Sequence, residues 1–127
     1  MKPKIVIGSS MKNRSLIKET LSDLEALGFE SLFPNIDASM ENKDVAENLE
    51  QKAGFARDHY KAIDEADAVY FILPKGYMGS SCKIELGYSI ALKKPIYFSE
   101  LTGEFDLDCY PKKIISLDEL DLFNEEF

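Results

Sequence analysis

Short apolar runs alternate along the chain with longer segments in which apolar residues recur at helical spacing. The apolar runs predict strands, which we place at residues 4–9, 29–33, 66–73, 95–99 and 112–116. The periodic segments predict helices, which we place at residues 14–27, 42–66, 81–93 and 117–123. Residues 100–111 contain Gly103, Pro111 and several acids, a composition that predicts a loop.

Strands that alternate with helices are typical of a parallel sheet with right-handed crossovers and with helices on both faces. We therefore predict an α/β fold whose five-stranded parallel sheet has the order 2-1-3-4-5. This order puts the topological switch point, where such sheets bind ligands, between the first and third strands. With 127 residues the chain has the size of one globular domain, so we expect a single domain over residues 1–127.

The helical pattern also predicts which faces are buried. In the helix at 42–66 we expect the face toward the sheet to carry Leu49, Ala53, Ala56, Tyr60 and Ile63. In the helix at 81–93 we expect the inner face to carry Ile84, Gly87, Tyr88 and Ala91. Gly87 would then let this helix approach the sheet closely.

Composition narrows the range of partners. The 23 acidic and 15 basic residues give a net charge of -8, and no segment concentrates Lys and Arg, so we expect neither a nucleic acid nor a membrane as partner. We find no signal peptide and no run of transmembrane length. Cys82, Cys109 and the single histidine lack metal-site spacing, and nothing identifies a flavin site. We expect no metal, no cofactor, and free thiols in a reducing cytoplasm.

Two loops rich in Gly and Ser follow the first and third strands. The first contains Gly8, Ser9 and Ser10, and the second contains Gly79, Ser80 and Ser81. Small residues let a ligand approach the main chain, and the amino ends of the helices that follow favour a phosphate or another anion. Neither loop has the spacing of a dinucleotide fingerprint or a P-loop. The alternative is that these serines, Ser81 above all, are helix N-caps.

Glu85 lies in the first turns of the helix after the second loop. One interpretation is that its charge only favours the amino end of the helix, an effect of roughly 0.3–1 kcal/mol at an exposed position. The other is that the carboxylate points into the cleft, where partial burial tunes it as a nucleophile or base.

Each of three further side chains has either a functional or an ordinary structural role. His59, the single imidazole, is either a ligand-facing group or an ordinary surface or satisfied residue. Tyr77 either closes over a base or sugar or is a solvent-facing loop residue. Asp67 precedes the third strand, about 20 Å from Pro74 at strand rise, and is interpreted as a turn or capping residue.

The chain resembles the nucleoside 2-deoxyribosyltransferase-like superfamily, which includes transferases and nucleotide N-glycoside hydrolases. The resemblance covers roughly residues 4 to 99. Its most specific block is Gly79-Ser80-Ser81-Cys82-Lys83-Ile84-Glu85-Leu86-Gly87-Tyr88-Ser89 and its continuation to Pro95. Weaker similarity lies in Ile5-Val6-Ile7-Gly8-Ser9-Ser10-Met11 and in Ala66-Asp67-Ala68-Val69-Tyr70.

The resemblance implies a flavodoxin-like three-layer sandwich and a role for each loop. Glu85 occupies the position of the glutamate that attacks the anomeric carbon of the sugar and forms a glycosyl-enzyme intermediate, much as in a retaining glycosidase. The positions that match the 5′-phosphate site of the nucleotide-hydrolysing members are Ser9, Ser10, Gly79, Ser80 and Ser81. The resemblance also implies a homodimer or higher homo-oligomer.

The chain departs from the family pattern at two positions. Typical active members carry a second catalytic aspartate eight residues before the position of Asp67, where this chain has His59, with Asp58 one position earlier. The aspartate that some transferases carry six residues before the glutamate is Gly79 here. The segment Gly76-Tyr77-Met78-Gly79-Ser80 is typical of a less characterised branch. In that branch histidine is ordinary at the position of His59.

The leading hypothesis is cleavage or transfer at the N-glycosidic bond of a nucleoside or nucleoside 5′-monophosphate, with hydrolysis favoured. Glu85 would be the nucleophile, and His59 would polarise or orient the sugar or leaving group. The two serine loops, with Gly8 and Tyr77, would hold the substrate. The rival hypothesis is a non-catalytic nucleotide-binding or signalling module of the same fold, which the loss of the second aspartate supports.

Overall fold

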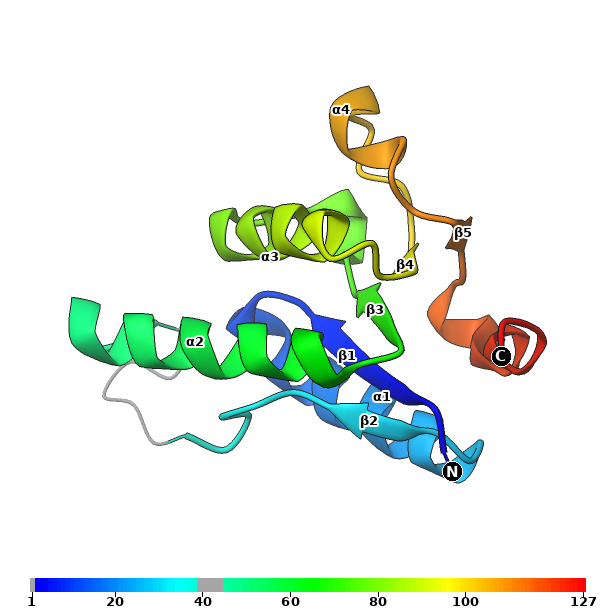
Figure 1. The fold of residues 1–127 in the computed structure, drawn as a ribbon, viewed down its shortest axis with the longest axis horizontal. Coiled ribbons are helices and arrows are strands. Elements are labelled where there is room, and N and C mark those ends of the chain that lie inside the picture. The colour runs from blue at the N-terminus through cyan, green and yellow to red at the C-terminus, as the bar shows by residue number, and fades with distance from the viewer. Residues whose placement is uncertain (1, 39–44) are drawn as a thin grey trace.

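A computed structural model describes residues 2–38 and 45–127 of the chain. Its five strands form one parallel sheet in the order β2-β1-β3-β4-β5, which confirms the predicted order (Figure 1). The strands are β1 (Lys4–Gly8), β2 (Glu30–Leu32), β3 (Ala68–Phe71), β4 (Ile96–Phe98) and β5 (Lys113–Ile114).

Helical segments connect the strands. The α-helices are α1 (Arg14–Ala26), α2 (Leu49–Glu65), α3 (Ser80–Ala91) and α4 (Phe105–Asp108). The 3-10 segments are η1 (Met11–Asn13), η2 (Pro74–Gly76) and η3 (Leu117–Glu125). Among the helices of the described ranges, none is both long enough and apolar enough to cross a membrane.

The sheet separates two apolar clusters, as the three-layer prediction requires. On one face Ile5, Ile7 and Tyr70 pack in one cluster with residues of α1 and η3. On the other face Val6 and Phe71 pack in a second cluster with residues of α2 and α3. Neighbouring strand residues alternate between the two faces because the side-chain period of a strand is two. Since both faces are covered, the central strands are apolar throughout, which is why they read as continuous apolar runs.

Two predicted element boundaries are wrong. The helix predicted at 42–66 begins at Leu49, where the Asn48 side chain accepts a hydrogen bond from the Gln51 amide at 2.8 Å and so caps the helix. Residues 42–44 of that prediction lie outside the described part of the chain. The predicted loop at 100–111 contains α4, one helical turn. The Asp108 carboxylate steadies this turn by accepting hydrogen bonds from Thr102.

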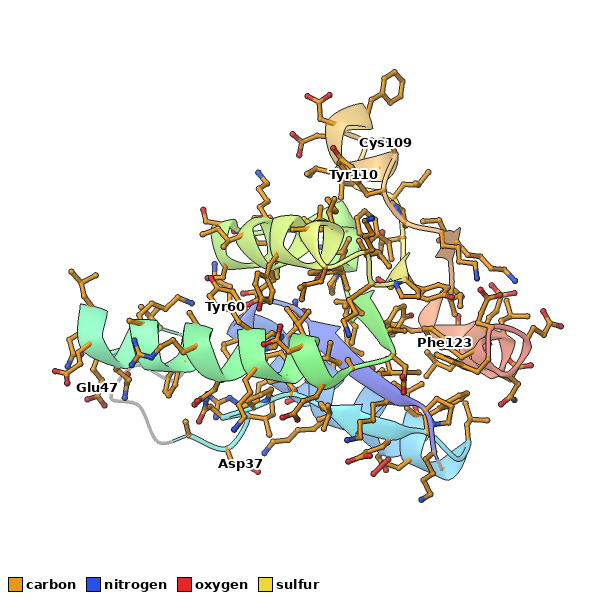
Figure 2. All side chains as sticks on the ribbon, in the orientation of Figure 1. Asp37, Glu47, Tyr60, Cys109, Tyr110 and Phe123 are labelled. Carbon is orange, nitrogen blue, oxygen red and sulfur yellow. The ribbon has the colours of Figure 1, made fainter. Side chains whose placement is uncertain are left out.

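The predicted inner face of α2 is wrong in the first half of the helix. Leu49 is 88% exposed, because the first turns of α2 extend beyond the sheet (Figure 1). In the second half, the buried residues are His59, Ala62 and Ile63. Tyr60 turns toward α3, where its ring lies 5.0 Å from that of Tyr88 (Figure 2). The face toward the sheet is therefore rotated from the predicted one.

The predicted inner face of α3 is also wrong. Its buried residues are Cys82, Glu85, Leu86 and Ser89. Ile84 is 60% exposed, Gly87 and Ala91 are exposed, and Tyr88 is half-buried. A side chain at Gly87 would meet nothing within 4 Å, so this glycine does not serve a close approach to the sheet. Both faces of α3 carry apolar residues, so periodicity alone could not select the buried one.

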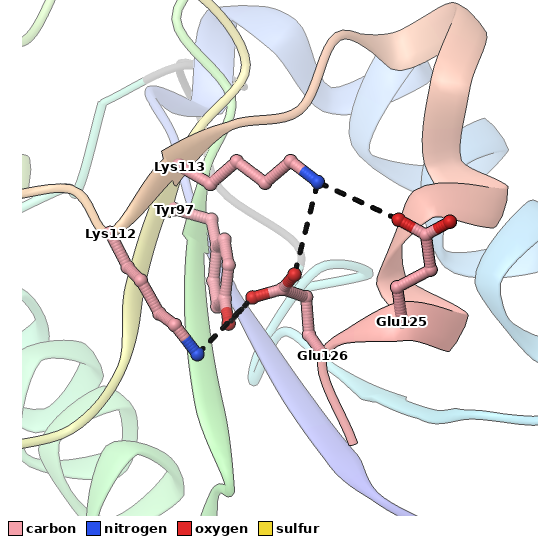
Figure 3. Close-up of polar contacts among 5 residues, drawn as sticks. All are labelled: Tyr97, Lys112, Lys113, Glu125 and Glu126. Atoms are coloured by element: carbon pink, nitrogen blue, oxygen red, sulfur yellow. Dashed lines mark hydrogen bonds and ion pairs between the residues drawn. The ribbon is translucent and has the colours of Figure 1, made fainter.

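The C-terminal residues are fixed to the sheet by a polar cluster (Figure 3). The Tyr97 hydroxyl donates to Glu126 Oε1 at 2.8 Å, and Lys112 Nζ lies 3.3 Å from the same oxygen. Lys113 Nζ lies 3.8 Å from Glu125 and 3.9 Å from Glu126. Burial is the largest cause that raises the pKa of Tyr97, so this hydroxyl remains a hydrogen-bond donor. The cluster holds η3 against β4 and β5.

Candidate active site

A cavity of about 250 Å³ opens at the carboxyl ends of β1 and β3, at the predicted switch point. The residues after β1, the start of α3 and one face of α2 form its walls. It is lined by all the side chains that the sequence analysis proposed for the site except Gly8, namely Ser9, Ser10, His59, Tyr77, Gly79, Ser80, Ser81 and Glu85. The fold thus brings together residues up to 76 positions apart in the sequence.

Gly8 lies beneath the cavity at the end of β1 rather than in its wall. A Cβ at this position would lie 2.6 Å from two carbon atoms of the Phe71 ring and 3.4 Å from Glu85 Oε1. Interiors are packed too closely to absorb such an overlap. The absent side chain of Gly8 therefore lets Phe71 and Glu85 take their positions.

Glu85 lies on the face of α3 that is turned to the sheet and is 9% exposed. Burial raises the pKa of its carboxyl group to about 8, because the charged form is poorly solvated there. This position differs from that of an exposed acid that only interacts with the helix dipole. A carboxyl group that is buried in a cavity wall and has a raised pKa is a common feature of acid–base and nucleophilic sites.

His59 faces Glu85 from α2 and is 6% exposed. Its Nε2 lies 3.6 Å from Glu85 Oε1 and has no hydrogen-bond partner within the described ranges. The backbone of Ile7 favours the protonated ring and so opposes the larger effect of burial on the pKa of His59. With the imidazole neutral, Nε2 can face Glu85 with its lone pair.

The Glu85–His59 pair holds one proton at neutral pH. Burial lowers the pKa of His59 to about 4 and raises that of Glu85 to about 8, so the carboxyl group is protonated and the imidazole is neutral. The two groups are therefore not an ion pair. Their separation of 3.6 Å exceeds an ordinary hydrogen bond, and a small side-chain rotation would let the Glu85 O–H donate to Nε2. The arrangement can pass a proton from one group to the other.

These pKa shifts predict how stability depends on pH. The folded state holds the Glu85 proton from pH 4.5 to about 8, which makes stability fall as the pH rises through this window. Between about pH 4 and 6.5 the unfolded state binds a proton on His59 that the folded state excludes. This difference makes stability rise as the pH rises through that window. The two effects oppose each other up to pH 6.5. From pH 6.5 to 8 only the Glu85 effect remains, and we expect the free energy of unfolding to fall by about 2 kcal/mol.

Urea unfolding of the wild type and of Glu85→Gln at pH 6.5 and 8 checks this expectation. The glutamine variant should lose the fall in stability, because its amide does not titrate. Glu50→Gln, at an exposed position of α2, should retain it. An equal fall in the wild type and in Glu85→Gln would contradict the assignment of the buried proton to Glu85.

Ser9 and Ser10 differ in what their hydroxyl groups can still bind. The Ser9 hydroxyl donates to the Ile72 carbonyl at 2.8 Å and accepts from Asn13 at 3.1 Å, so its proton is directed away from the cavity. The Ser10 hydroxyl accepts from the Lys12 amide at 3.3 Å and caps η1, which leaves its own proton available. Ser9 thus joins the loop after β1 to the segment after β3, and Ser10 can donate to a ligand.

The start of α3 presents free donors to the cavity. Its N-cap residue is Gly79, which has no side chain to cap the helix, so the N-cap interpretation of Ser81 is wrong. Ser80 and Ser81 are instead the first two helical residues, and their hydroxyl groups have no hydrogen-bond partner in the described ranges. The first amide groups of a helix also lack intrahelical partners. This end of α3 can therefore hold an anion.

Tyr77 lines the cavity and is also 58% exposed. It is therefore a solvent-facing loop residue that could also contact a base or sugar. Its hydroxyl lies 3.3 Å from the point where a Cβ on Gly79 would be. The missing side chain of Gly79 gives the tyrosine ring room beside the entrance.

Neither aspartate considered above lies in the cavity wall. Asp67 accepts a hydrogen bond from the Lys4 amide at 2.8 Å at the opposite end of the sheet, in agreement with its interpretation as a turn or capping residue. Asp58 is exposed and accepts from the Asn35 side chain at 2.9 Å. His59 is therefore the α2 side chain that faces Glu85.

Several cavity residues were missed by the sequence analysis. They are Met11, Phe33, Pro34, Asn35, Lys52, Phe55, Ala56 and Cys82. Lys52 could have been found, because it lies seven residues before His59 and thus on the same face of α2. Phe33 follows β2, and its ring meets that of His59 edge-on, with 5.1 Å between the centroids. No local signal in the sequence indicated that contact.

Cys82 is a poor candidate for a nucleophile. It is 3% exposed, and burial raises the pKa of its thiol to about 12, so the reactive thiolate is scarce at neutral pH. Within residues 2–38 and 45–127, no group of three or more His, Cys, Asp and Glu side chains has the arrangement of a metal site. Among the cavity residues, the strongest candidates for covalent chemistry are Glu85 and His59.

Comparison with known proteins points to one family. The family model described as nucleoside 2-deoxyribosyltransferase matches residues 7–107. A 2-deoxyribosyltransferase from Bacillus psychrosaccharolyticus has a similar structure, with 20% identity, a TM-score of 0.64, and coverage of 93% of this chain and 90% of that chain. No curated protein matches the sequence.

Two further solved structures share the fold. A conserved protein from Enterococcus faecalis V583 is 11% identical with a TM-score of 0.63, and the match covers 97% of this chain and 99% of that chain. The CMP N-glycosidase of Clostridium botulinum is 18% identical with a TM-score of 0.57, and the match covers 98% of this chain and 99% of that chain.

Proposed function

Because the chain belongs to the nucleoside 2-deoxyribosyltransferase family, we propose that it cleaves the N-glycosidic bond of a nucleoside or nucleoside 5′-monophosphate through a covalent intermediate on Glu85. The observation that carries the proposal is the buried Glu85–His59 pair in the wall of a cavity at the switch point. Two relatives of the same fold support the type of bond, since one is named a 2-deoxyribosyltransferase and the other a CMP N-glycosidase.

The first step uses the proton that the pair holds. Glu85 passes its proton to His59 Nε2 when substrate fills the cavity, which leaves a carboxylate beside an imidazolium. The carboxylate oxygen bonds to C1′ as the bond from C1′ to the nucleobase nitrogen breaks, and that electron pair leaves with the base. The imidazolium then gives its proton to the departing base. A neutral base and a glycosyl ester on Glu85 result.

The second step restores the pair. Neutral His59 takes a proton from a water molecule, whose oxygen bonds to C1′ while the ester bond to Glu85 breaks. The carboxylate leaves with its electron pair, and the proton on His59 returns to it. Over the cycle one water is consumed, the sugar gains the hydroxyl, and the base gains the hydrogen. The single proton is therefore sufficient for both steps.

Hydrolysis is favoured over transfer to a second base. Some transferases of the resembled superfamily carry an aspartate six residues before the glutamate, and Gly79 stands there in this chain. With glycine at that position, this wall of the cavity offers main-chain groups but no carboxylate to hold an acceptor base. Water then remains the acceptor in the second step.

The direct test is a base-release assay on a panel of nucleosides and nucleoside 5′-monophosphates, with ribose and deoxyribose members. Chromatography measures the free base and the free sugar or sugar phosphate. A second base added in excess detects transfer as a new nucleoside. Absence of base release from every member, with a folded protein, would overturn the proposal.

A second candidate function is a nucleotide-binding module without turnover. The observation in its favour is that His59 stands where typical active members carry aspartate. Calorimetry distinguishes the two, because tight nucleotide binding without product after long incubation selects the module.

We also propose that the chain forms a homo-oligomer through the outer faces of α3 and α4. These helices and the residues that flank α4 leave apolar side chains in solvent, with Ile84 60%, Leu101 57%, Phe105 90% and Tyr110 47% exposed. Figure 2 shows that Tyr110 lies on the segment that extends away from the sheet beyond α3. Such a surface is typical of a protein interface.

We expect the double variant Ile84→Gln, Phe105→Gln to lower the native mass to that of the 14.4 kDa monomer at micromolar concentration, because it removes two apolar contacts from the interface. Size-exclusion chromatography with light scattering measures the mass. The matched control is Leu27→Gln, an exposed leucine after α1, on the other face of the sheet. A wild-type protein that is monomeric at these concentrations would contradict the oligomer.

A further inference from the structure

Lys52 is a cationic side chain in the cavity wall that has no acidic partner within the described ranges. By contrast, Lys18, Lys112 and Lys113 each form an ion pair with an acidic side chain. The neighbours of Lys52 on its own helix face are apolar or neutral, namely Asn48, Leu49, Phe55 and Ala56. Without an acid at three or four positions before or after it, Lys52 lacks the usual helical ion pair. Its ammonium group remains available to a ligand.

The charge of Lys52 reaches the interior of the cavity. It lowers the pKa of Glu85, His59 and Cys82, although burial is the larger cause of the shift at each of them. Lys52 lines the same cavity as Ser80, Ser81 and Cys82 of the first turn of α3. Glu85 is protonated at neutral pH, which leaves Lys52 as the charged side chain among the described residues of the cavity wall.

Two further features of this cavity favour a polar ligand with an anionic part. The first turn of α3 offers amide groups, and Ser10, Ser80 and Ser81 offer hydroxyl donors. The buried and unpartnered Nε2 of His59 indicates that a polar ligand group completes the opposite part of the cavity. The positive amino end of α3 and the ammonium group of Lys52 therefore line the same cavity. The Glu85–His59 pair lines this cavity as well.

We propose that Lys52 binds the 5′-phosphate of the substrate from the α2 side while the start of α3 binds it from the other. The protein would thereby select nucleoside 5′-monophosphates over nucleosides. This inference rests on the proposed function for its reaction, but the binding that it describes can be measured separately. A dianionic phosphate supplies the negative charge that Lys52 has no acidic side chain to provide, whereas a free nucleoside carries no such charge.

The test replaces Lys52 by methionine, which keeps the length of the side chain and removes the charge, and by arginine, which keeps the charge. For Lys52→Met we expect kcat/KM to fall about 10- to 100-fold on a nucleoside 5′-monophosphate and less than about 3-fold on the matching nucleoside. Lys52→Arg should retain most of the preference. The control is Lys61→Met, an exposed lysine of α2 outside this cavity, which should leave both values unchanged.

Calorimetry on Glu85→Gln measures binding without turnover. We expect a nucleoside 5′-monophosphate to bind more tightly than its nucleoside, with a difference that shrinks at high salt and in the double variant with Lys52→Met. Inorganic phosphate, used alone, should compete with the nucleotide and bind more weakly. Competition by phosphate that is equally strong in Lys52→Met would assign the anion site to other donors and overturn the role of Lys52.

The outcomes separate this inference from the proposed function. If nucleotide and nucleoside are cleaved equally by the wild type and by Lys52→Met, the role of Lys52 is wrong and the proposed function stands. If no base is released but nucleotide binding depends on Lys52, the proposed function is wrong and the phosphate site stands.

Discussion

Glu85→Gln is expected to lower the rate of base release by at least about 10³-fold. The amide is a poor nucleophile toward C1′, and the substitution also removes the proton that the Glu85–His59 pair holds. Glutamine has nearly the shape of glutamic acid, which is the form present at neutral pH. The variant should therefore fold and bind substrate much as the wild type does.

The measurement is the single-turnover release of base by the purified variant, with nucleotide binding followed in parallel. Glu50→Gln removes one carboxylate at an exposed site of α2 and should retain the wild-type rate. Equal base release by the wild type and Glu85→Gln would remove Glu85 from the mechanism. A glycosyl adduct of the wild type, detected by mass spectrometry of the quenched protein and absent from Glu85→Gln, would support the covalent route.

His59→Gln is the second variant with a large expected effect, a loss of about 10²- to 10⁴-fold in kcat. Glutamine can still hydrogen-bond to a neighbour, but it cannot take the proton from Glu85 and pass it to the departing base. The proton would then remain on the carboxyl group, which leaves little of the nucleophile at neutral pH. Asp58→Asn, at the neighbouring exposed position of α2, is the control and should leave kcat unchanged.

The pH profile separates this catalytic role from a merely structural one. In the wild type the active form has one proton on the pair, so activity should fall below about pH 4 and above about pH 8. In His59→Gln the residual rate should instead rise as the pH passes through the pKa of Glu85, because only ionisation of the nucleophile limits it. A profile of unchanged shape in the variant would show that His59 does not carry the proton.

The strand order could be predicted from the sequence without knowledge of side-chain contacts. Each central strand reads as an apolar run because both faces of the sheet are covered, and the helical segments between them require parallel crossovers. The two serine loops had to meet at the switch point once that order was fixed, as Ser9 and Ser80 do. The position of Glu85 near the start of a helix after β3 followed from the same local pattern.

Sequence spacing could not decide which face of a helix is buried where both faces carry apolar residues. In α3 the packing of Leu86 against the sheet selected the face that also buries Glu85, and Ile84 was left in solvent. In α2 the sheet ends before the first turns, so Leu49 remains exposed although its spacing fits the apolar repeat.

The amino-acid sequence by itself determined the five strands, the helices α1, α2 and α3, the strand order, and the place where the loops converge. These depend on periodicity and turn chemistry, which act over a few neighbouring residues. Only the tertiary structure decided that His59 meets Glu85 and that the Ser9 proton is directed to Ile72. Those contacts join residues from separate elements, and the burial that shifts both pKa values exists only when the elements are packed together.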